Sequence, residues 1–231
     1  MFCHHCGTQV GDAPFCPNCG QPANVAGSLG ASTPSAWIPP SGVHSQTGRW
    51  IGEGWALVKN DIGNYVLLAI IYCVLSGVVP LILQGPLTVG FHIFTMKKLM
   101  GRRPEIADMF TGFNFFVPAL VATILISVLT TLGTILCIIP GLVIAAMYKF
   151  TYLFILDKRM DFWPAMQASH AIVKQDYFGF TMFLLALVGV NLLGVICCVI
   201  GVFVTIPLTF AAITVAYREL VGFDEQTVAA L

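Results

Sequence analysis

The residues of this sequence that most plainly suggest chemistry are four cysteines close to the N-terminus. Cys3 and Cys6 form one Cys-x2-Cys pair, and Cys16 and Cys19 form a second pair after nine intervening residues. Four thiolates at such a spacing complete the tetrahedral shell of a Zn²⁺ ion. Because a complete shell leaves no position open for a substrate, the pattern predicts a structural zinc ion rather than a catalytic one.

The segment that carries these cysteines, residues 1–22, is predicted to fold as a zinc ribbon. It is too short to bury a core of its own, so zinc binding would supply its folding free energy. His4 and His5 could compete as ligands, but we expect both to face solvent once four thiolates are bound. Asp12 is the only charged side chain in the segment. The metal-bound ribbon would therefore be acidic, which favours a protein partner over nucleic acid.

The rest of the chain has the composition of a membrane protein. Hydrophobic residues make up 57% of the sequence and charged residues 10%, whereas a soluble domain carries about a quarter charged residues. The formal net charge is zero, which again argues against nucleic acid as a partner. The start of the sequence has neither the basic region nor the apolar stretch of a signal peptide. We therefore expect the first transmembrane helix to act as the targeting signal.

Three long runs contain no Asp, Glu, Lys or Arg: residues 62–96, 109–148 and 177–217, which are 35, 40 and 41 residues long. One membrane crossing takes about 20 residues, so each run predicts a hairpin of two helices. The fold class is therefore all-α, with three helical hairpins and about six transmembrane helices. The predicted helices cover residues 64–83, 87–100, 115–138, 142–157, 178–199 and 202–218.

Turn residues are expected to divide each run into its two helices. The candidates are Gln84-Gly85-Pro86, Pro140-Gly141, and Gly201 with Pro207 beyond it. The first hairpin is the shortest, because Lys97 follows its turn closely. It either crosses the bilayer twice or forms a shallow, re-entrant pair.

The basic residues predict how the chain is oriented. With three hairpins, all charged linkers lie on the same side of the membrane as the N-terminus and the C-terminus, and the positive-inside rule makes that side cytosolic. Thiolate zinc sites also favour the reducing cytosol. We therefore expect a multi-pass protein of the bacterial inner membrane. The basic residues on the cytosolic side would be Lys97, Lys98, Arg102, Arg103, Lys158, Arg159, Lys174 and Arg218.

An internal repeat is also predicted. Ala-Leu-Val-Lys-Asn-Asp at 56–61 resembles Ala-Ile-Val-Lys-Gln-Asp at 171–176, and each precedes a hairpin. We expect a flexible linker at 23–47, a membrane domain at 48–222 and a C-terminal tail at 223–231. The membrane domain would contain three units, at about 48–103, 104–158 and 159–222. Each unit would begin with an interfacial helix whose aromatic rings lie in the headgroup layer. These rings belong to Trp50, Trp55, Phe110, Phe113 and Trp163.

Three polar residues inside the apolar runs are candidates for an intramembrane site. Lys149 is the one charge within its helix; it either snorkels to the interface, pairs with a polar group or binds an anion in a cavity. His92 is either a proton relay or a hydrogen-bonded core residue. Asn191 is expected to make an interhelical hydrogen bond. Asp157 and Asp161 lie beside Lys158 and Arg159, and a solvated, salt-bridged loop is predicted there.

No motif in the sequence nominates an enzyme. Paired intramembrane carboxylates, a Ser-His-Asp set, a phosphate-binding glycine loop and HExxH are all missing from the sequence. We expect a non-enzymatic adaptor or regulator whose ribbon binds a protein. The alternative is a small transporter or lipid-handling protein with a cavity between its hairpins. A common cavity lined by His92 and Lys149 would favour this alternative, whereas lipid contact or tight packing would favour the adaptor.

Two parts of the chain resemble known groups. Residues 1–20 resemble the zinc-ribbon heads of many bacterial membrane proteins. Residues 48–222 are similar to a broad bacterial group of uncharacterised six-helix membrane proteins, which includes the membrane domain of some glycerophosphodiester phosphodiesterases. This second resemblance implies an inner-membrane location, and it carries no catalytic activity over because the chain has no phosphodiesterase domain. It rests on Gly85-Pro86-Leu87 with Gly90, on Asp108-Met109-Phe110, on Ile139-Pro140-Gly141, and on Ser169 preceding Lys174.

Overall fold

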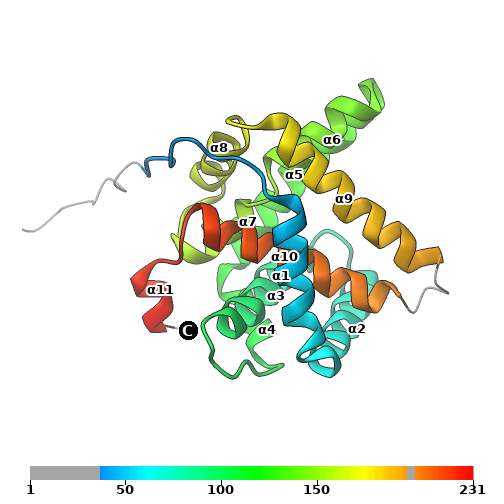
Figure 1. Ribbon diagram of the computed structural model, residues 1–231, viewed down its shortest axis with the longest axis vertical. Helices are drawn as coiled ribbons and strands as arrows, with labels where there is room; N and C mark the ends of the chain where they lie inside the picture. The colour runs from blue at the N-terminus through cyan, green and yellow to red at the C-terminus, as the bar shows by residue number, and fades with distance from the viewer. Residues whose placement is uncertain (1–36, 197–200, 231) are drawn as a thin grey trace, which may run out of the picture. The chain divides into compact units, whose positions relative to one another are not determined.

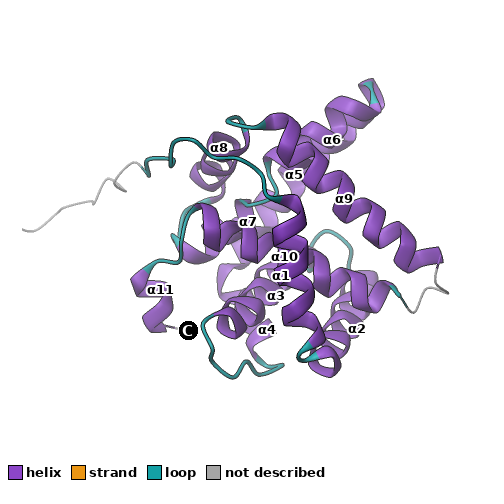
Figure 2. Ribbon diagram, in the orientation of Figure 1, coloured by secondary structure: helices purple, strands orange, loops and turns teal. Residues whose placement is uncertain are grey.

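The protein is seen in a computed structural model that describes residues 37–196 and 201–230 (Figure 1). Every secondary-structure element in this part of the chain is a helix (Figure 2). The elements are α1 (Thr47–Lys59), α2 (Ile62–Val78), α3 (Gln84–Leu99), α4 (Asp108–Thr111), a 3₁₀ helix η1 (Gly112–Phe115), α5 (Phe116–Leu136), α6 (Ile138–Met147), α7 (Thr151–Asp157), α8 (Phe162–Val173), α9 (Tyr177–Ile196), α10 (Val202–Leu220) and α11 (Glu225–Ala230).

Among the described residues, four helical stretches are long and apolar enough to cross a membrane. They are Asp108–Leu136, Ile138–Asp157, Tyr177–Ile196 and Val202–Leu220, and α1 with α2 would make a fifth if this pair, bent by 100°, counts as one span. Large apolar side chains are exposed along these helices, including Phe178, Leu192 and Ile196 on α9. Such a surface is stable against lipid and costly in water.

Two of the predicted turns are wrong. Pro86 and Pro140 do not separate helices; they lie in the first turns of α3 and α6. Proline is tolerated there because the first N–H groups of a helix have no intrahelical acceptor. The first hairpin turns instead after Val78, where Pro80 follows the end of α2 and Leu81 has a positive φ of 67°. The second turns at Cys137, whose backbone is extended.

Helix α3 is the centre of the helical packing. Every residue from Gly85 to Met96 is buried. Its neighbours are α2, α4, η1, α5, α7 and α10. Its hairpin partner α2 is therefore only one of the elements that cover α3. At about 1.5 Å per residue its 16 residues span about 24 Å, less than the hydrocarbon core of about 30 Å. The helix is therefore a short, enclosed core element.

Helix α1 packs across α10 (Figure 1), and these two helices make the most extensive contact in the described chain. A Cβ added at Gly54 would come within 2.8 Å of the backbone nitrogen of Ala212, so glycine permits this approach. Trp50 was expected in the headgroup layer, but its ring is fully buried. Its indole Nε1 donates to Glu219 Oε2 at 2.8 Å. The indole is buried together with a partner for its N–H, which satisfies this polar group.

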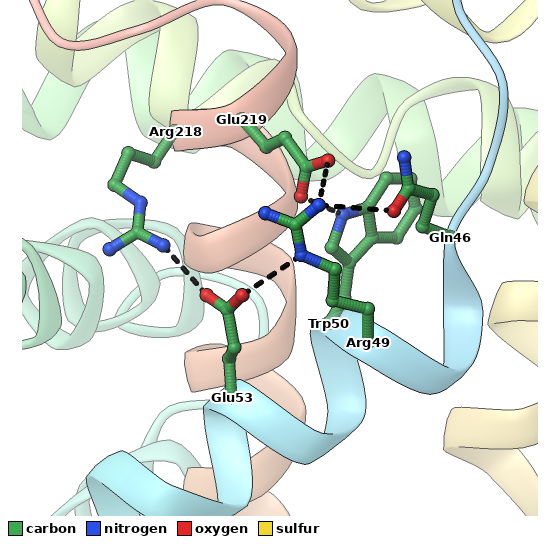
Figure 3. A network of polar contacts seen from close by, with 6 residues as sticks. All are labelled: Gln46, Arg49, Trp50, Glu53, Arg218 and Glu219. Atoms are coloured by element: carbon green, nitrogen blue, oxygen red, sulfur yellow. Dashed lines mark hydrogen bonds and ion pairs between the residues drawn. The ribbon is translucent and has the colours of Figure 1, made fainter.

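A charged network closes the contact between α1 and α10 (Figure 3). Arg49 bridges Glu53 at 3.1 Å and Glu219 at 3.2 Å, and Arg218 pairs with Glu53 at 2.7 Å. These side chains are partly exposed, so water and salt weaken each pair. The network fixes the register of α1 on α10 more than it stabilises the fold.

The order of the elements has a recurring form. A short helix precedes two longer helical segments in α1–α2–α3, in α4–η1–α5 with α6 and α7, and in α8–α9–α10. The short elements differ in how they enter the next helix. The 100° bend between α1 and α2 has no counterpart at α4 and η1, which continue into α5 within one stretch from Asp108 to Leu136. The three-unit repeat remains a prediction.

The end of the predicted linker 23–47 is held against the turn between α8 and α9. Gln175 Nε2 donates to the carbonyl of Pro40 at 2.7 Å, and its Oε1 accepts the Val43 N–H at 3.2 Å. Asp176 Oδ2 accepts the Ser45 N–H at 3.0 Å, and Oδ1 accepts the Gly179 N–H at 2.9 Å. Residues 40–45 are therefore anchored to the helical body before α1 begins.

This anchor should weaken in acid. The backbone hydrogen bond from Ser45 is the main cause that holds the pKa of Asp176 below its ordinary value of 3.8. Because the pKa is lower in the folded state, the ionised carboxylate stabilises the anchor at pH values above the ordinary pKa. This stabilisation is lost as the pH falls through the lowered pKa. We expect amide exchange in residues 43–46, corrected for its intrinsic pH dependence, to accelerate below about pH 4. In Asp176→Ala it should be fast at every pH, and protection unchanged by acid in the wild type would contradict this role.

Candidate functional site

A cavity of about 440 Å³ lies between the helices, and both His92 and Lys149 line it. This volume is within the range of about 300–1,000 Å³ typical of small-molecule sites. The lining comes from α2, α3, α5, α6, α7 and α10 and from the residues that join α6 to α7. It comprises Tyr72, Gln84, Thr88, His92, Thr123, Ile126, Ser127, Thr130, Thr131, Ala145, Tyr148, Lys149, Tyr152, Thr209, Phe210 and Ile213.

Lys149 lies in a short interruption between two helices. Helix α6 ends at Met147 and α7 begins at Thr151. Ser169 of α8 supports this interruption: its hydroxyl donates to the Met147 carbonyl at 2.6 Å and accepts the Phe150 N–H at 3.2 Å. One side chain thus satisfies two backbone groups that a continuous helix would have paired internally. The interruption between α6 and α7 is therefore stabilised by a specific contact from α8.

The ammonium group of Lys149 has no hydrogen bond or ion pair with any residue in 37–196 or 201–230. No Asp or Glu lines the cavity around it. A lysine in an apolar region normally pairs with another polar group or reaches water. In this structure Lys149 lines the cavity instead.

His92 lies at the closed end of the cavity and is 1% exposed. Its Nδ1 is 2.8 Å from Thr214 Oγ1, and this hydroxyl donates its proton to the Phe210 carbonyl at 2.8 Å. Because a hydroxyl has one proton, the Nδ1 of His92 must be the donor in the first contact. In the neutral ring Nε2 is then an acceptor, so His92 can offer a lone pair to the cavity.

Asn191 is not part of the cavity lining. Its amide Nδ2 donates to Thr209 Oγ1 at 2.7 Å and to the Leu187 carbonyl at 2.8 Å. The first bond joins α9 to α10, and it is the interhelical bond that the sequence suggested. Thr209 does line the cavity. Asn191 therefore contributes to the site indirectly, by holding the Thr209 side chain.

A polar stripe on α5 completes the site, and the sequence analysis missed it. Thr123, Ser127, Thr130 and Thr131 recur at intervals of three and four residues or adjoin each other, which places them on one face of a helix. All four line the cavity. This helical periodicity of hydroxyl residues within an apolar run was the signal that could have found it.

The two ends of the cavity differ in exposure. Gln84 and Thr131 are exposed, whereas His92 and Thr123 are buried. Gln84 begins α3 and Thr131 lies near the end of α5, so both are close to the uncharged hairpin turns. The exposed end of the cavity therefore faces those turns, and its buried end faces the charged linkers.

Two hydroxyl pairs fix the walls near the buried end. Thr123 Oγ1 and Tyr152 Oη are 3.0 Å apart and join α5 to α7. Tyr72 Oη and Thr88 Oγ1 are 3.3 Å apart and join α2 to α3. These contacts orient both tyrosines along the cavity, so the polar lining does not depend on Lys149 and His92 alone.

The described residues contain no group of three His, Cys, Asp or Glu side chains able to hold a metal ion. The predicted zinc ligands Cys3, Cys6, Cys16 and Cys19 lie outside the described part of the chain.

Comparison with known proteins finds relatives that are described as uncharacterised. The chain is 27% identical over 203 residues to an uncharacterised protein of Mycobacterium bovis and to one of Mycobacterium tuberculosis strain CDC 1551, and 26% identical to one of strain H37Rv. Each alignment covers 88% of this chain and 58% of the relative, so the chain spans little more than half the length of the relatives it matches. No family model and no solved structure matches it. The resemblance to zinc-ribbon heads and to the six-helix group remains a prediction.

Proposed function

We propose that this protein is a multi-pass membrane protein that binds a small solute or lipid in the cavity between its helices, as a transporter or lipid-handling protein. The observation that supports this function is that His92 and Lys149 line one cavity. The hydroxyl-rich lining supports the same function, because polar side chains fix the orientation of a bound molecule in small-molecule sites.

We further propose six crossings of the bacterial inner membrane, with both termini in the cytosol. This topology rests on the charge distribution and the positive-inside rule. The shortness of α2 and α3 does not contradict it, because neighbouring helices enclose α3 and the bilayer can thin locally. In this topology the exposed end of the cavity, at Gln84 and Thr131, opens away from the cytosol.

Filling the cavity tests the binding function. Ser127 faces the cavity, whereas its neighbour Val128 is 50% exposed on the outer surface of α5. Ser127→Phe would place an aromatic ring in the cavity, and Val128→Phe would add similar volume toward lipid. We expect a molecule extracted with wild-type protein from native membranes to be retained by Val128→Phe and reduced at least about tenfold in Ser127→Phe, a loss of about 1.4 kcal/mol in binding.

The measurement is mass spectrometry of small molecules and lipids that co-purify with each protein in mild detergent. Equal thermal stability of the two variants serves as the folding control. Identical recovery of every bound species from both variants would contradict a binding cavity.

The zinc ribbon and its role as a protein-binding adaptor remain a second proposal, supported by the spacing of Cys3, Cys6, Cys16 and Cys19. The two proposals are compatible, since a ribbon could connect the membrane domain to a cytosolic protein. Zinc would be structural in that ribbon and would not take part in binding within the membrane.

A further inference from the structure

We infer that the cavity takes an amphiphile with an anionic group, a phosphate or a carboxylate, and that the ammonium of Lys149 holds this group. The inference rests on the proposed binding function and names the chemical class of its ligand. Four observations lead to it: the charge of the lining, the support of Lys149, an unpaired hydroxyl and the presence of both polar and apolar side chains in the lining.

The charge of the lining favours an anion. Among the sixteen lining residues Lys149 is the one charged side chain, and none is acidic. A cation in the cavity would meet an ammonium without any compensating carboxylate, whereas an anion would pair with it. In a region of low dielectric such a pair is stronger than on a water-exposed surface. The sign of the preferred ligand therefore follows from the lining.

Lys149 is held where it can act on a ligand. The Ser169 hydroxyl bonds on both sides of the interruption between α6 and α7, at Met147 and at Phe150. The lysine thus extends from a fixed turn that another helix braces. A simple snorkelling lysine would need no such brace, since its side chain reaches the interface from a regular helix.

A hydroxyl without a partner lies in the same lining. Thr130 Oγ1 is buried and makes no hydrogen bond within the described chain. A buried polar atom left unpaired is destabilising. The Oγ1 atom itself is enclosed in the structure, so a change of the Thr130 rotamer would have to turn it toward the cavity, where it would donate to an anionic oxygen.

The lining contains both polar and apolar side chains, which indicates an amphiphile and not a bare ion. The hydroxyls of Ser127, Thr130 and Tyr152 accompany Lys149, while Ile126, Ala145, Phe210 and Ile213 supply apolar surface. A volume of about 440 Å³ greatly exceeds that of one phosphate. An apolar portion attached to the anionic group would fill the rest and gain about 25 cal/mol per Å² of buried surface.

The experiment compares three probes on the full chain in detergent: inorganic phosphate, dioctanoyl phosphatidic acid and dioctanoyl phosphatidylcholine. Binding is measured by native mass spectrometry and by the shift of the apparent Tm. We expect phosphatidic acid to bind at least about tenfold more tightly than phosphatidylcholine of the same chain length. Inorganic phosphate alone should bind weakly, because it lacks the apolar portion.

Variants assign the effect to the cavity. Lys149→Gln should abolish the preference for the anionic lipid, and Lys149→Arg should retain it. Lys59→Gln, at an exposed position at the end of α1, removes the same charge elsewhere and should leave the preference unchanged. Loss of a charge from an apolar region does not threaten folding, so Lys149→Gln remains an informative variant.

The outcomes separate this inference from the proposed function. Equal binding of both lipids that is lost in Ser127→Phe would overturn the anionic class and leave the cavity as a binding site. Binding that neither Lys149→Gln nor Ser127→Phe affects would overturn both. Phosphate binding as tight as that of phosphatidic acid would overturn the amphiphile and assign the site to a free anion.

Discussion

Gly90→Ala is expected to destabilise the protein by about 3 kcal/mol or more, because the added methyl group has no space. A Cβ at Gly90 would overlap the backbone carbonyl of Met109, and one at Gly112 would overlap the carbonyl of Pro86. The α3 backbone therefore lies directly against α4 and η1, and the contact is reciprocal. A backbone atom cannot turn away as a side chain can, so the helices themselves would have to separate.

The measurement is the apparent Tm of the purified protein in detergent, with a second glycine as control. Gly189 lies within α9 and has no atom within 4 Å of its added Cβ. Gly189→Ala should leave the Tm unchanged or raise it, since alanine favours helix by about 0.5–1 kcal/mol over glycine. A Tm for Gly90→Ala equal to that of Gly189→Ala would show that α3 and α4 do not pack this closely.

This contact also explains why the sequence showed two glycine- and proline-containing or aromatic motifs but did not show that they pack together. Gly85-Pro86-Leu87 with Gly90, and Asp108-Met109-Phe110, were noted as separate features of a resemblance. In the fold they meet, because Gly90 packs on Met109 and Gly112 packs on Pro86. Their spacing along the chain gave no indication of this, since the contact joins two elements whose approach only the tertiary structure sets.

The approximate positions of the apolar helices followed from charge-free runs, because hydrocarbon excludes ionised side chains over the length of a span. The number of six crossings remains a prediction. Interruptions did not follow. The break before Thr151 contains neither proline nor glycine, and the hydroxyl that supports it belongs to Ser169, on another helix. The prolines led to the opposite error. Pro86 and Pro140 were predicted to lie in turns between helices, although the first turn of a helix accommodates proline.

The cavity could be anticipated only in part. Lys149 and His92 stood out singly, because each is rare in an apolar run. Their convergence on one cavity depends on the central place of α3 among its neighbouring helices, which is not a local property of the sequence. The hydroxyl residues of α5 could have been recognised in the sequence, because threonine and serine recur there with a helical period. A hydropathy average over the segment does not show this period.

Asp157→Ala is expected to cost about 3 kcal/mol and to release the C-terminal segment. The predicted solvated, salt-bridged loop is correct only in part: Asp161 is exposed and Asp157 pairs with Lys158, but the Asp157 side chain is 0% exposed and not solvated. Its Oδ2 accepts the Tyr217 hydroxyl at 2.9 Å, and its Oδ1 accepts the Asp224 N–H at 2.9 Å. Lys158 Nζ lies 3.4 Å from Asp157 Oδ2 and 3.2 Å from Asp224 Oδ2.

This carboxylate therefore joins the end of α7 to α10 and to the residue that precedes α11. Truncation would leave the Tyr217 hydroxyl and the Asp224 N–H unpaired, and unpaired buried donors cost more than the bond itself contributes. Tyr217→Phe removes one donor together with its need for a partner, so it should cost less, about 1–2 kcal/mol. Asp161→Ala, at an exposed position four residues later, is the matched control and should change stability by less than about 0.5 kcal/mol.

Two measurements distinguish a local anchor from a general loss of stability. Thermal unfolding in detergent should rank the variants as Asp157→Ala below Tyr217→Phe below Asp161→Ala. Hydrogen exchange at native temperature should accelerate in residues 224–228 of Asp157→Ala while α3 stays protected, because the carboxylate holds that segment directly through the Asp224 N–H. If exchange in 224–228 matched the wild type while the Tm fell, Asp157 would stabilise the bundle through Tyr217 alone, and the C-terminal helix would owe its position to other contacts.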